Sequence, residues 1–265
     1  MPLVFVAITP HPPIIVPGVG NSDDLRKCQS TVSAMKKLAR SFADAKVDTI
    51  VIMSPHSPST PKAFTVNVAP ELKSSLTEFG VPKPEYTQAP NTELIGQITE
   101  DTSHTEIQIA PIENSALDHG VNVPLHYLLQ ANSDIKLVSL GYTDYPPAGH
   151  FSFGQQLSSI LDEAKDRVAF IASGDLSHRL TAEAPAGFSP RGKEFDEQIV
   201  KAVKEYDLPS ILSANEELIQ EAGECGLRSI ATLLGVVDQQ KSEPEILSYE
   251  GPFGVGYLVA NFKLN

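Results

Sequence analysis

The chain has 265 residues, 41% of them hydrophobic, and a formal net charge of −13 at pH 7. This length suits one large α/β domain, and because no stretch looks like a linker we expect a single domain over residues 1–265. The acidic balance, without a cluster of Lys and Arg, argues against nucleic acid and anionic lipid as partners, because both need a basic face.

Three apolar runs each end shortly before a histidine. The runs are too short for globular helices, so they predict buried strands. The carboxyl ends of strands form the ligand-binding edge of an open α/β sheet, and the three histidines are therefore expected to meet there. The runs cover residues 3–8, 49–53 and 168–172, and the histidines that follow them are His11, His56 and His178.

The first helix is predicted as one continuous element. Asn21 and the acids after it supply an N-cap and first turn, and an apolar stripe extends from Leu25 to Phe42. Just before it, residues 18–20 resemble half of a dinucleotide fingerprint, but Asp23 stands where the third glycine would be. A carboxylate there would repel a pyrophosphate, so we interpret this segment as a loop.

The middle of the chain is less regular. Residues 64–68 and 105–110 alternate like strands, and the polar, proline-rich region between them predicts one helix at 92–99 and a solvated His104. Pro124 suits the first turn of a helix that runs to about residue 130, which leaves His119 in the preceding loop.

The C-terminal half alternates again between strands and helices. His150, just before one of these helices, is expected to cap it or to lie on the surface. Strands are predicted at 135–140, 246–249 and 255–262, and helices at 151–163, 190–206, 208–214, 215–222 and 227–237. The pattern as a whole predicts a mostly parallel or mixed sheet flanked by helices.

The location in the cell follows from three absences. The longest apolar runs have six or seven residues, against the roughly 20 that a bilayer requires. The chain enters its first strand without the basic region of a secretory signal. Its two cysteines, Cys28 and Cys225, are too few for a disulfide framework. We therefore expect a soluble cytoplasmic protein with no membrane partner.

A metal site is the chemistry that this arrangement favours. Two histidines and one carboxylate that leave open positions are typical of non-haem Fe(II) oxygenases. His11 and His56 supply the imidazoles, and Glu224, held between glycines at a helix start, supplies the acid. Each of these residues has a simpler explanation. A histidine after proline is often a turn residue, and the negative charge of Glu224 could stabilise the N-terminus of a helix through the helix dipole. Cys225 is either a small buried residue or a thiol of lowered pKa.

Five segments together resemble the class III extradiol ring-cleavage dioxygenases, such as the catalytic subunit of the protocatechuate extradiol enzyme, and the related Memo-like proteins. The likeness covers nearly the whole chain in order. The segments are Thr9-Pro10-His11-Pro12, Ser54-Pro55-His56, residues 118–125 (Asp-His-Gly-Val-Asn-Val-Pro-Leu), Gly174-Asp175-Leu176-Ser177-His178 and residues 221–226 (Glu-Ala-Gly-Glu-Cys-Gly).

The resemblance implies roles for these residues. His11 and His56 would bind iron, and His178 would remove a proton from a catechol hydroxyl. His119 would orient the substrate and dioxygen, or donate a proton. The third ligand would be Glu224, as in the dioxygenases, or Cys225, as in Memo-like proteins, and we favour Glu224.

Two supporting residues complete the expected site. Asp175 would orient His178 or brace its loop, and His126, a packed residue near the ligands, joins His119 and Asp175 in the expected substrate-binding set. The resemblance implies Fe(II), with Zn as an alternative ion, a small aromatic diol and O₂ as reactants, and a homodimer. Two alternative functions are a Memo-like protein without dioxygenase activity and a zinc hydrolase.

Overall fold

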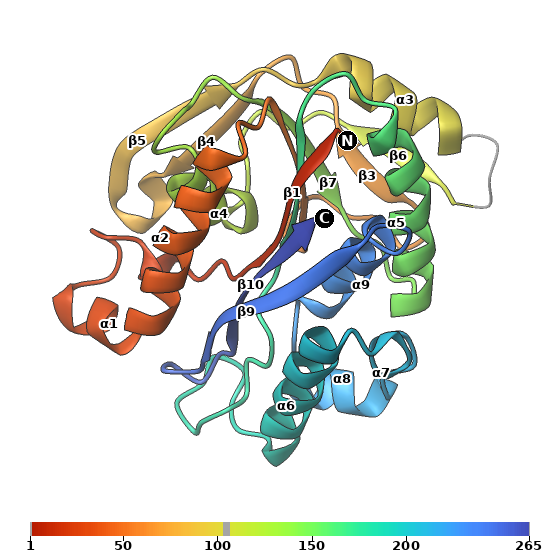
Figure 1. The fold of residues 1–265 in the computed structure, drawn as a ribbon. Coiled ribbons are helices and arrows are strands. Elements are labelled where there is room, and N and C mark those ends of the chain that lie inside the picture. Colours follow the sequence, from red (N-terminus) through yellow and green to blue (C-terminus); the bar gives the residue numbers. More distant parts are fainter. Residues whose placement is uncertain (1, 103–106, 265) are drawn as a thin grey trace.

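A computed structural model describes residues 2–102 and 107–264 of the chain (Figure 1). Helices cover both faces of one large mixed sheet, so the predicted α/β class is confirmed. His104 and the first residues of the strand expected at 105–110 lie outside the described residues, and the strand described there is β6 (Ile109–Ile112). Among the described residues no helix has the length and apolar character to cross a membrane.

The main sheet has eight strands in the order β6-β3-β7-β2-β8-β1-β10-β9. Its four central strands, β7, β2, β8 and β1, are parallel to one another, whereas β3 and β10 run antiparallel to their central neighbours. The strands are β1 (Leu3–Thr9), β2 (Thr49–Ser54), β3 (Phe64–Asn67), β6 (Ile109–Ile112), β7 (Lys136–Gly141), β8 (Val168–Ser173), β9 (Ser242–Glu250) and β10 (Tyr257–Leu264).

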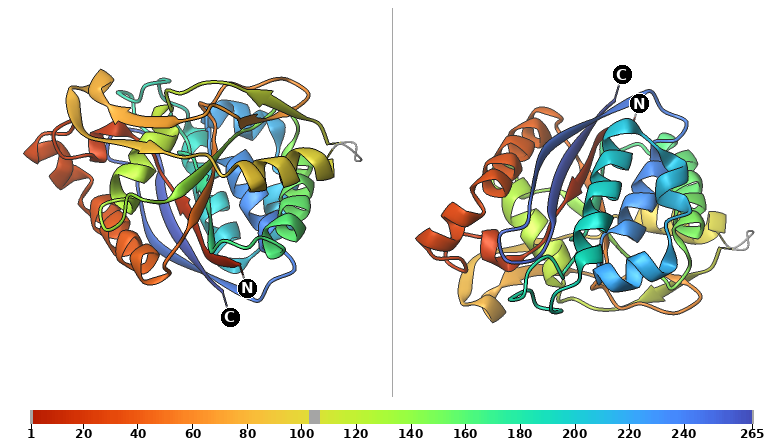
Figure 2. Two further views of the ribbon diagram at one scale, coloured as in Figure 1. Left: turned by 90° about the horizontal axis from the view of Figure 1, so that it is seen from above. Right: turned by 90° about the horizontal axis from the view of Figure 1, so that it is seen from below.

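The helices form two layers on the sheet, one of α1, α2 and α4 and the other of α3 and α5 to α9 (Figure 2). Both faces of the central strands are therefore buried, and alternate residues of β2 belong to different cores: Val51 packs on one side and Ile52 on the other. The helices are α1 (Ser22–Lys27), α2 (Gln29–Asp44), α3 (Thr92–Thr102), α4 (His119–Leu128), α5 (Pro147–Asp162), α6 (Pro190–Glu205), α7 (Leu208–Leu212), α8 (Glu216–Ala222) and α9 (Leu227–Val236).

The helix predicted from Leu25 to Phe42 is two helices. Asn21 caps α1 through its side chain, and the chain breaks at Cys28 before α2 begins. Glu250, at the end of β9, accepts hydrogen bonds from the backbone N–H and the hydroxyl of Thr31 in the first turn of α2. A side chain more than two hundred positions away therefore caps α2, and no local pattern could predict this break.

Two further expectations about helices are corrected. Helix α4 starts at His119 and carries Pro124 in its interior, so His119 is the first helical residue and does not lie in a loop. His150 lies within α5 and is fully buried, with its ring 4.9 Å from the ring of Phe64 and its Nδ1 bonded to the carbonyl of Pro146. Because α5 begins at Pro147, one turn earlier than predicted, His150 faces the core.

A second, two-stranded sheet was not predicted. Strands β4 (Leu72–Leu76) and β5 (Val81–Gln88) are antiparallel, joined by a short 3-10 turn, η2 (Thr77–Phe79), and Gly80 in the left-handed region. Much of β5 is exposed, so its sequence lacks the apolar alternation of a half-buried strand. The hairpin brings Phe79 against His119, with ring centroids 5.9 Å apart.

The parallel core places the ends of three strands at one edge of the sheet. Thr9 at the end of β1 pairs with Ser173 at the end of β8, and Met53 of β2 pairs with Ala172. His11, His56 and Asp175 each follow the last residue of such a strand by two positions. The sheet thus delivers these three side chains to the same region.

Candidate metal centre

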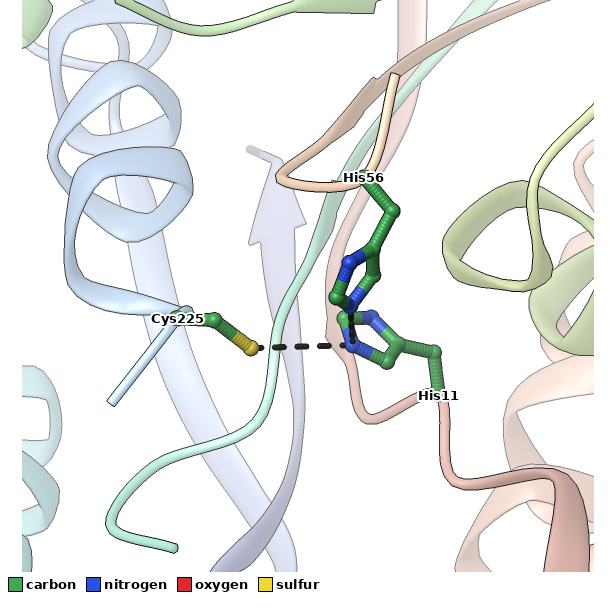
Figure 3. Close-up of side chains that lie close together, drawn as sticks. All are labelled: His11, His56 and Cys225. Atoms are coloured by element: carbon green, nitrogen blue, oxygen red, sulfur yellow. Dashed lines mark hydrogen bonds between the residues drawn. The ribbon is translucent and has the colours of Figure 1, made fainter. Parts of the chain in front are cut away.

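Three side chains from distant parts of the chain point toward one another (Figure 3). The Nε2 atom of His11 lies 3.1 Å from Nε2 of His56 and 3.6 Å from Sγ of Cys225. Around a tetrahedral ion with metal–nitrogen bonds of about 2.05 Å and metal–sulfur bonds of about 2.3 Å, donor atoms would be roughly 3.3 and 3.6 Å apart. These two distances fit a single metal ion, and all three donor atoms lie within 4.8 Å of one another.

Asp175 connects His11 to Cys225. Its Oδ1 accepts the backbone N–H of His11 at 3.0 Å, and its carbonyl accepts the backbone N–H of Cys225 at 3.1 Å. Its own backbone N–H points at the sulfur of Cys225, 3.3 Å away. One buried residue after β8 thus fixes the loop after β1 and the segment before α9.

Two glycines allow that close approach. A Cβ atom on Gly174 would lie 2.3 Å from Cα of Gly226, and one on Gly226 would lie 2.9 Å from the carbonyl oxygen of Asp175. Backbone therefore packs directly on backbone at this point. The separation leaves no space for any side chain, which explains both glycines next to the site.

Asp118 holds the loop that carries His56. Its two carboxylate oxygens accept the hydroxyl groups of Ser54 at 2.6 Å and Ser57 at 2.8 Å. The Ser54 hydroxyl oxygen in turn accepts the backbone N–H of His56 at 3.2 Å. Asp118 also precedes α4, so the same carboxylate ties His56 to the helix that begins with His119.

Burial keeps the three donors uncharged. It lowers the pKa of His11 well below the usual range, and three neighbouring histidines lower it further. Burial also lowers the pKa of His56, with Asp118 opposing the shift. Burial, assisted by Asp175, raises the pKa of the Cys225 thiol well above its usual value. The thiol pKa is therefore raised and not lowered as expected, and an ion that binds the thiolate would displace its proton.

Two more histidines surround the three donors. The ring of His119 lies against that of His56, tilted by 32° with centroids 4.2 Å apart, and 5.4 Å from the ring of His11. The backbone N–H of His178 donates to the carbonyl of Ala222, and burial lowers the pKa of its ring. Of the three histidines predicted to meet at the sheet edge, His11 and His56 are in direct contact, and a charge on His178 would lower the pKa of both rings.

A family model described as the catalytic LigB subunit of aromatic ring-opening dioxygenase matches residues 5–260. The chain belongs to the LigB family. The resemblance to class III extradiol enzymes that the sequence motifs indicated is therefore confirmed over nearly the whole chain.

Relatives of this LigB chain include proteins with and without a named activity. A Clostridium acetobutylicum protein named only by its locus is 33% identical over 97% of this chain, which spans only 56% of that relative's length. A 3,4-dihydroxyphenylacetate 2,3-dioxygenase of Escherichia coli is 24% identical over 83% of this chain and 84% of the length of that enzyme. The crystal structure of an uncharacterised protein of Escherichia coli K12 has the same fold, with a TM-score of 0.69, 19% identity and coverage of 98% of this chain and 99% of its own.

We favoured Glu224 as the acid that faces the two histidines. Its carboxylate instead faces the start of α9. Its Oε2 accepts the backbone N–H of Leu227 at 2.6 Å, and its Oε1 lies 4.0 Å from Arg228. Burial raises the pKa of Glu224 to about 7. The side chain turns back onto the first turn of α9, and its neighbour Cys225 takes the place beside His11.

The described contacts of His126 do not link it to the candidate donors, whereas three hydrogen-bonding residues of the site were not predicted. His126 lies two turns along α4 from His119, and its described ring contact is with Tyr127, at 5.3 Å. The three residues that were not predicted are Asp118, Ser54 and Ser57, which together hold the loop of His56. The signal was present, because serines on both sides of a Pro-His pair offer hydroxyl donors to a nearby acid.

Proposed function

We propose that this LigB chain is a metal-dependent extradiol dioxygenase that opens the ring of a small aromatic diol. The observation that carries the proposal is the convergence of His11, His56 and Cys225 beside two further histidines. Family membership and the named dioxygenase relative support the same reaction class. In the proposed ligand set, Cys225 replaces the Glu224 that the motifs favoured.

The chain's own groups suit the proposed chemistry. The bound metal, Fe(II) by the family's precedent, would supply a site where diol and O₂ are held together. His178, kept neutral by burial, would accept the proton of a diol hydroxyl. The ring of His119, which lies tilted against His56 and edge-on to Phe79, would contact the aromatic ring and orient it. Asp175 would keep His11 and Cys225 in register.

One observation favours a second function. A thiolate and two imidazoles also match zinc or copper, and cysteine is the residue that the resemblance associates with Memo-like proteins. The second candidate is therefore a Memo-like metal-binding protein in which ring opening is lost.

Metal content and oxygen uptake separate the two candidates. Protein prepared anaerobically would be analysed for bound metal, loaded with Fe(II), and given a panel of catechols in an oxygen electrode. Uptake of one O₂ per diol with formation of a coloured ring-opened product is the expected result. Stable binding of zinc or copper, and no uptake with any catechol after Fe(II) loading, would refute the dioxygenase and favour the Memo-like function.

A further inference from the structure

Helix α4 has a proline one turn after Gly120. In an α-helix the backbone N–H of residue 124 would donate to the carbonyl of residue 120, but Pro124 has no N–H. The carbonyl of Gly120 instead accepts the hydroxyl of Ser173, with 2.5 Å between the oxygens. Ser173 is the last residue of β8 and is fully buried, so the helix and the sheet meet at this bond.

This bond determines which atom is the donor in the hydrogen bond between Ser173 and His11. A serine hydroxyl has a single proton, and a carbonyl oxygen can only accept, so the proton of Ser173 points at Gly120. The oxygen of Ser173 lies 2.9 Å from Nδ1 of His11 and can act there only as an acceptor. Nδ1 must therefore carry the proton, and in the neutral ring Nε2 then has an unprotonated lone pair that faces His56 and Cys225.

We propose that Pro124 and Ser173 are positioning residues that hold His11 in the one tautomer whose Nε2 can bind a metal. Pro124 leaves the carbonyl of Gly120 free, that carbonyl orients the hydroxyl of Ser173, and the hydroxyl oxygen fixes the proton on Nδ1. This inference rests on the role proposed above for His11 as a metal ligand. It gives a function to the proline in the Asp-His-Gly-Val-Asn-Val-Pro-Leu segment.

The site also contains a partner for the other tautomer, so the choice matters. Oδ2 of Asp175 lies 3.8 Å from Nε2 of His11 and would attract a proton placed there. The first turn of α4 lies against the same ring: a Cβ on Gly120 would be 3.4 Å from Nδ1 of His11 and 2.3 Å from the hydroxyl of Ser54. Without Ser173, the contact with Asp175 would favour a proton on Nε2.

The tautomer can be read in the metal-free protein by nitrogen NMR of histidine-labelled samples, with the His11 signal assigned by its loss in His11→Gln. We expect wild-type His11 to be protonated at Nδ1 and bare at Nε2. In Ser173→Ala the proton should move wholly or partly to Nε2. Pro124→Ala restores an N–H that competes for the Gly120 carbonyl, and we expect a smaller shift in the same direction.

Ser229→Ala is the matched control, because Ser229 is a fully buried serine whose hydroxyl has no hydrogen-bond partner among the described residues. Zinc affinity should fall by about 10- to 100-fold in Ser173→Ala and stay within about twofold of the wild type in Ser229→Ala, which loses no bond to a ligand.

A wild-type His11 protonated at Nε2 would overturn the inference even if Ser173→Ala failed to fold. An unchanged tautomer in a folded Ser173→Ala protein would overturn it as well. A protein that binds no metal would refute the proposed function but not this inference, because the tautomer is measured without metal.

Discussion

Cys225 and Glu224 are neighbours in the chain but have different surroundings, and this difference predicts opposite effects of mutation. Cys225→Ala removes a donor 3.6 Å from Nε2 of His11 and should abolish stable metal retention. Glu224→Gln keeps an oxygen for the N–H of Leu227 and should leave metal content near one ion per chain. Metal analysis after gel filtration checks both variants. If Glu224→Gln lost the metal and Cys225→Ala retained it, the third ligand would be Glu224 and not Cys225.

His178 is predicted to act on the substrate and not on the metal. His178→Phe should keep the metal content of the wild type, since the three proposed donors remain. Turnover of a catechol should fall by about 10²- to 10⁴-fold, the usual contribution of a general base. Oxygen uptake at saturating substrate measures the loss, and His11→Ala provides the comparison. Metal loss in His178→Phe as complete as in His11→Ala would contradict the role.

At the scale of single residues, the sequence predicted part of the site. His11, His56 and His178 follow buried strands, and from that local pattern we predicted that they meet; His11 and His56 are in direct contact. The choice between Glu224 and Cys225 depends on how one turn of chain enters α9, which no local pattern specifies. Ser173 acts only through a carbonyl in a different element, so its role appears only in three dimensions.

At the scale of elements, the contact between the end of β8 and the start of α9 should tolerate no added atom. Gly174→Ala would place a Cβ 2.3 Å from Cα of Gly226 and must push apart the segments that carry Asp175 and Cys225. We expect a loss of about 1–3 kcal/mol in the free energy of unfolding, as for other overpacked sites, together with weaker metal binding. Urea denaturation and zinc titration measure the two effects.

Gly96→Ala is the control for that substitution. Gly96 lies on the exposed side of α3, and a Cβ there would meet no atom within 4 Å. Alanine is the better helix former, so this variant should gain up to about 1 kcal/mol of stability. Equal stability of Gly174→Ala and Gly96→Ala would show that the β8–α9 contact can relax.

The elements that the sequence predicted are those with strong apolar patterns. The buried strands β1, β2, β7 and β8 lie within one or two residues of their predicted ranges. The β4–β5 hairpin was missed because β5 is mostly exposed and contains two prolines. The break at Cys28 depends on Glu250, and the early start of α4 places an interior proline where sequence rules expect a first turn.

At the scale of the whole molecule, His150 should make the fold sensitive to acid. Burial lowers the pKa of His150 to about 4 from an unfolded value near 6.5, so the fold prefers the neutral ring. This contribution is intact above pH 6.5 and is lost as the pH falls toward 4, because the unfolded chain takes up the proton first. The loss at pH 4.5 should be about 2–3 kcal/mol.

His150→Phe tests that prediction, because the ring already packs beside Phe64 and its Nε2 has no hydrogen-bond partner among the described residues. Other buried groups titrate in the same range, so the quantity to compare is the change in unfolding free energy between pH 7.5 and 4.5 in the two proteins. Between these two pH values, the unfolding free energy of His150→Phe should fall by about 2–3 kcal/mol less than that of the wild type. The same loss in both would mean that His150 is not the group responsible.

The class of the fold was predictable because short apolar runs alternate with amphipathic helices. The order of the strands was not, since neighbours in the sheet are far apart in the chain: β1 lies between β8 and β10. Pairing of such distant segments depends on how all the helices pack on the sheet. A sequence pattern describes each helix separately and carries no information about this packing.

The central place of β1 has a consequence for synthesis. Both of its partners, β8 and β10, are translated much later than β1 itself. Its apolar residues must therefore remain without these partners until β8 has been made, a period in which a nascent chain is prone to aggregate. His11 cannot meet Ser173 or Cys225 before those segments emerge, so any metal ion held by His11, His56 and Cys225 would be loaded only after the segment with Cys225 has been made.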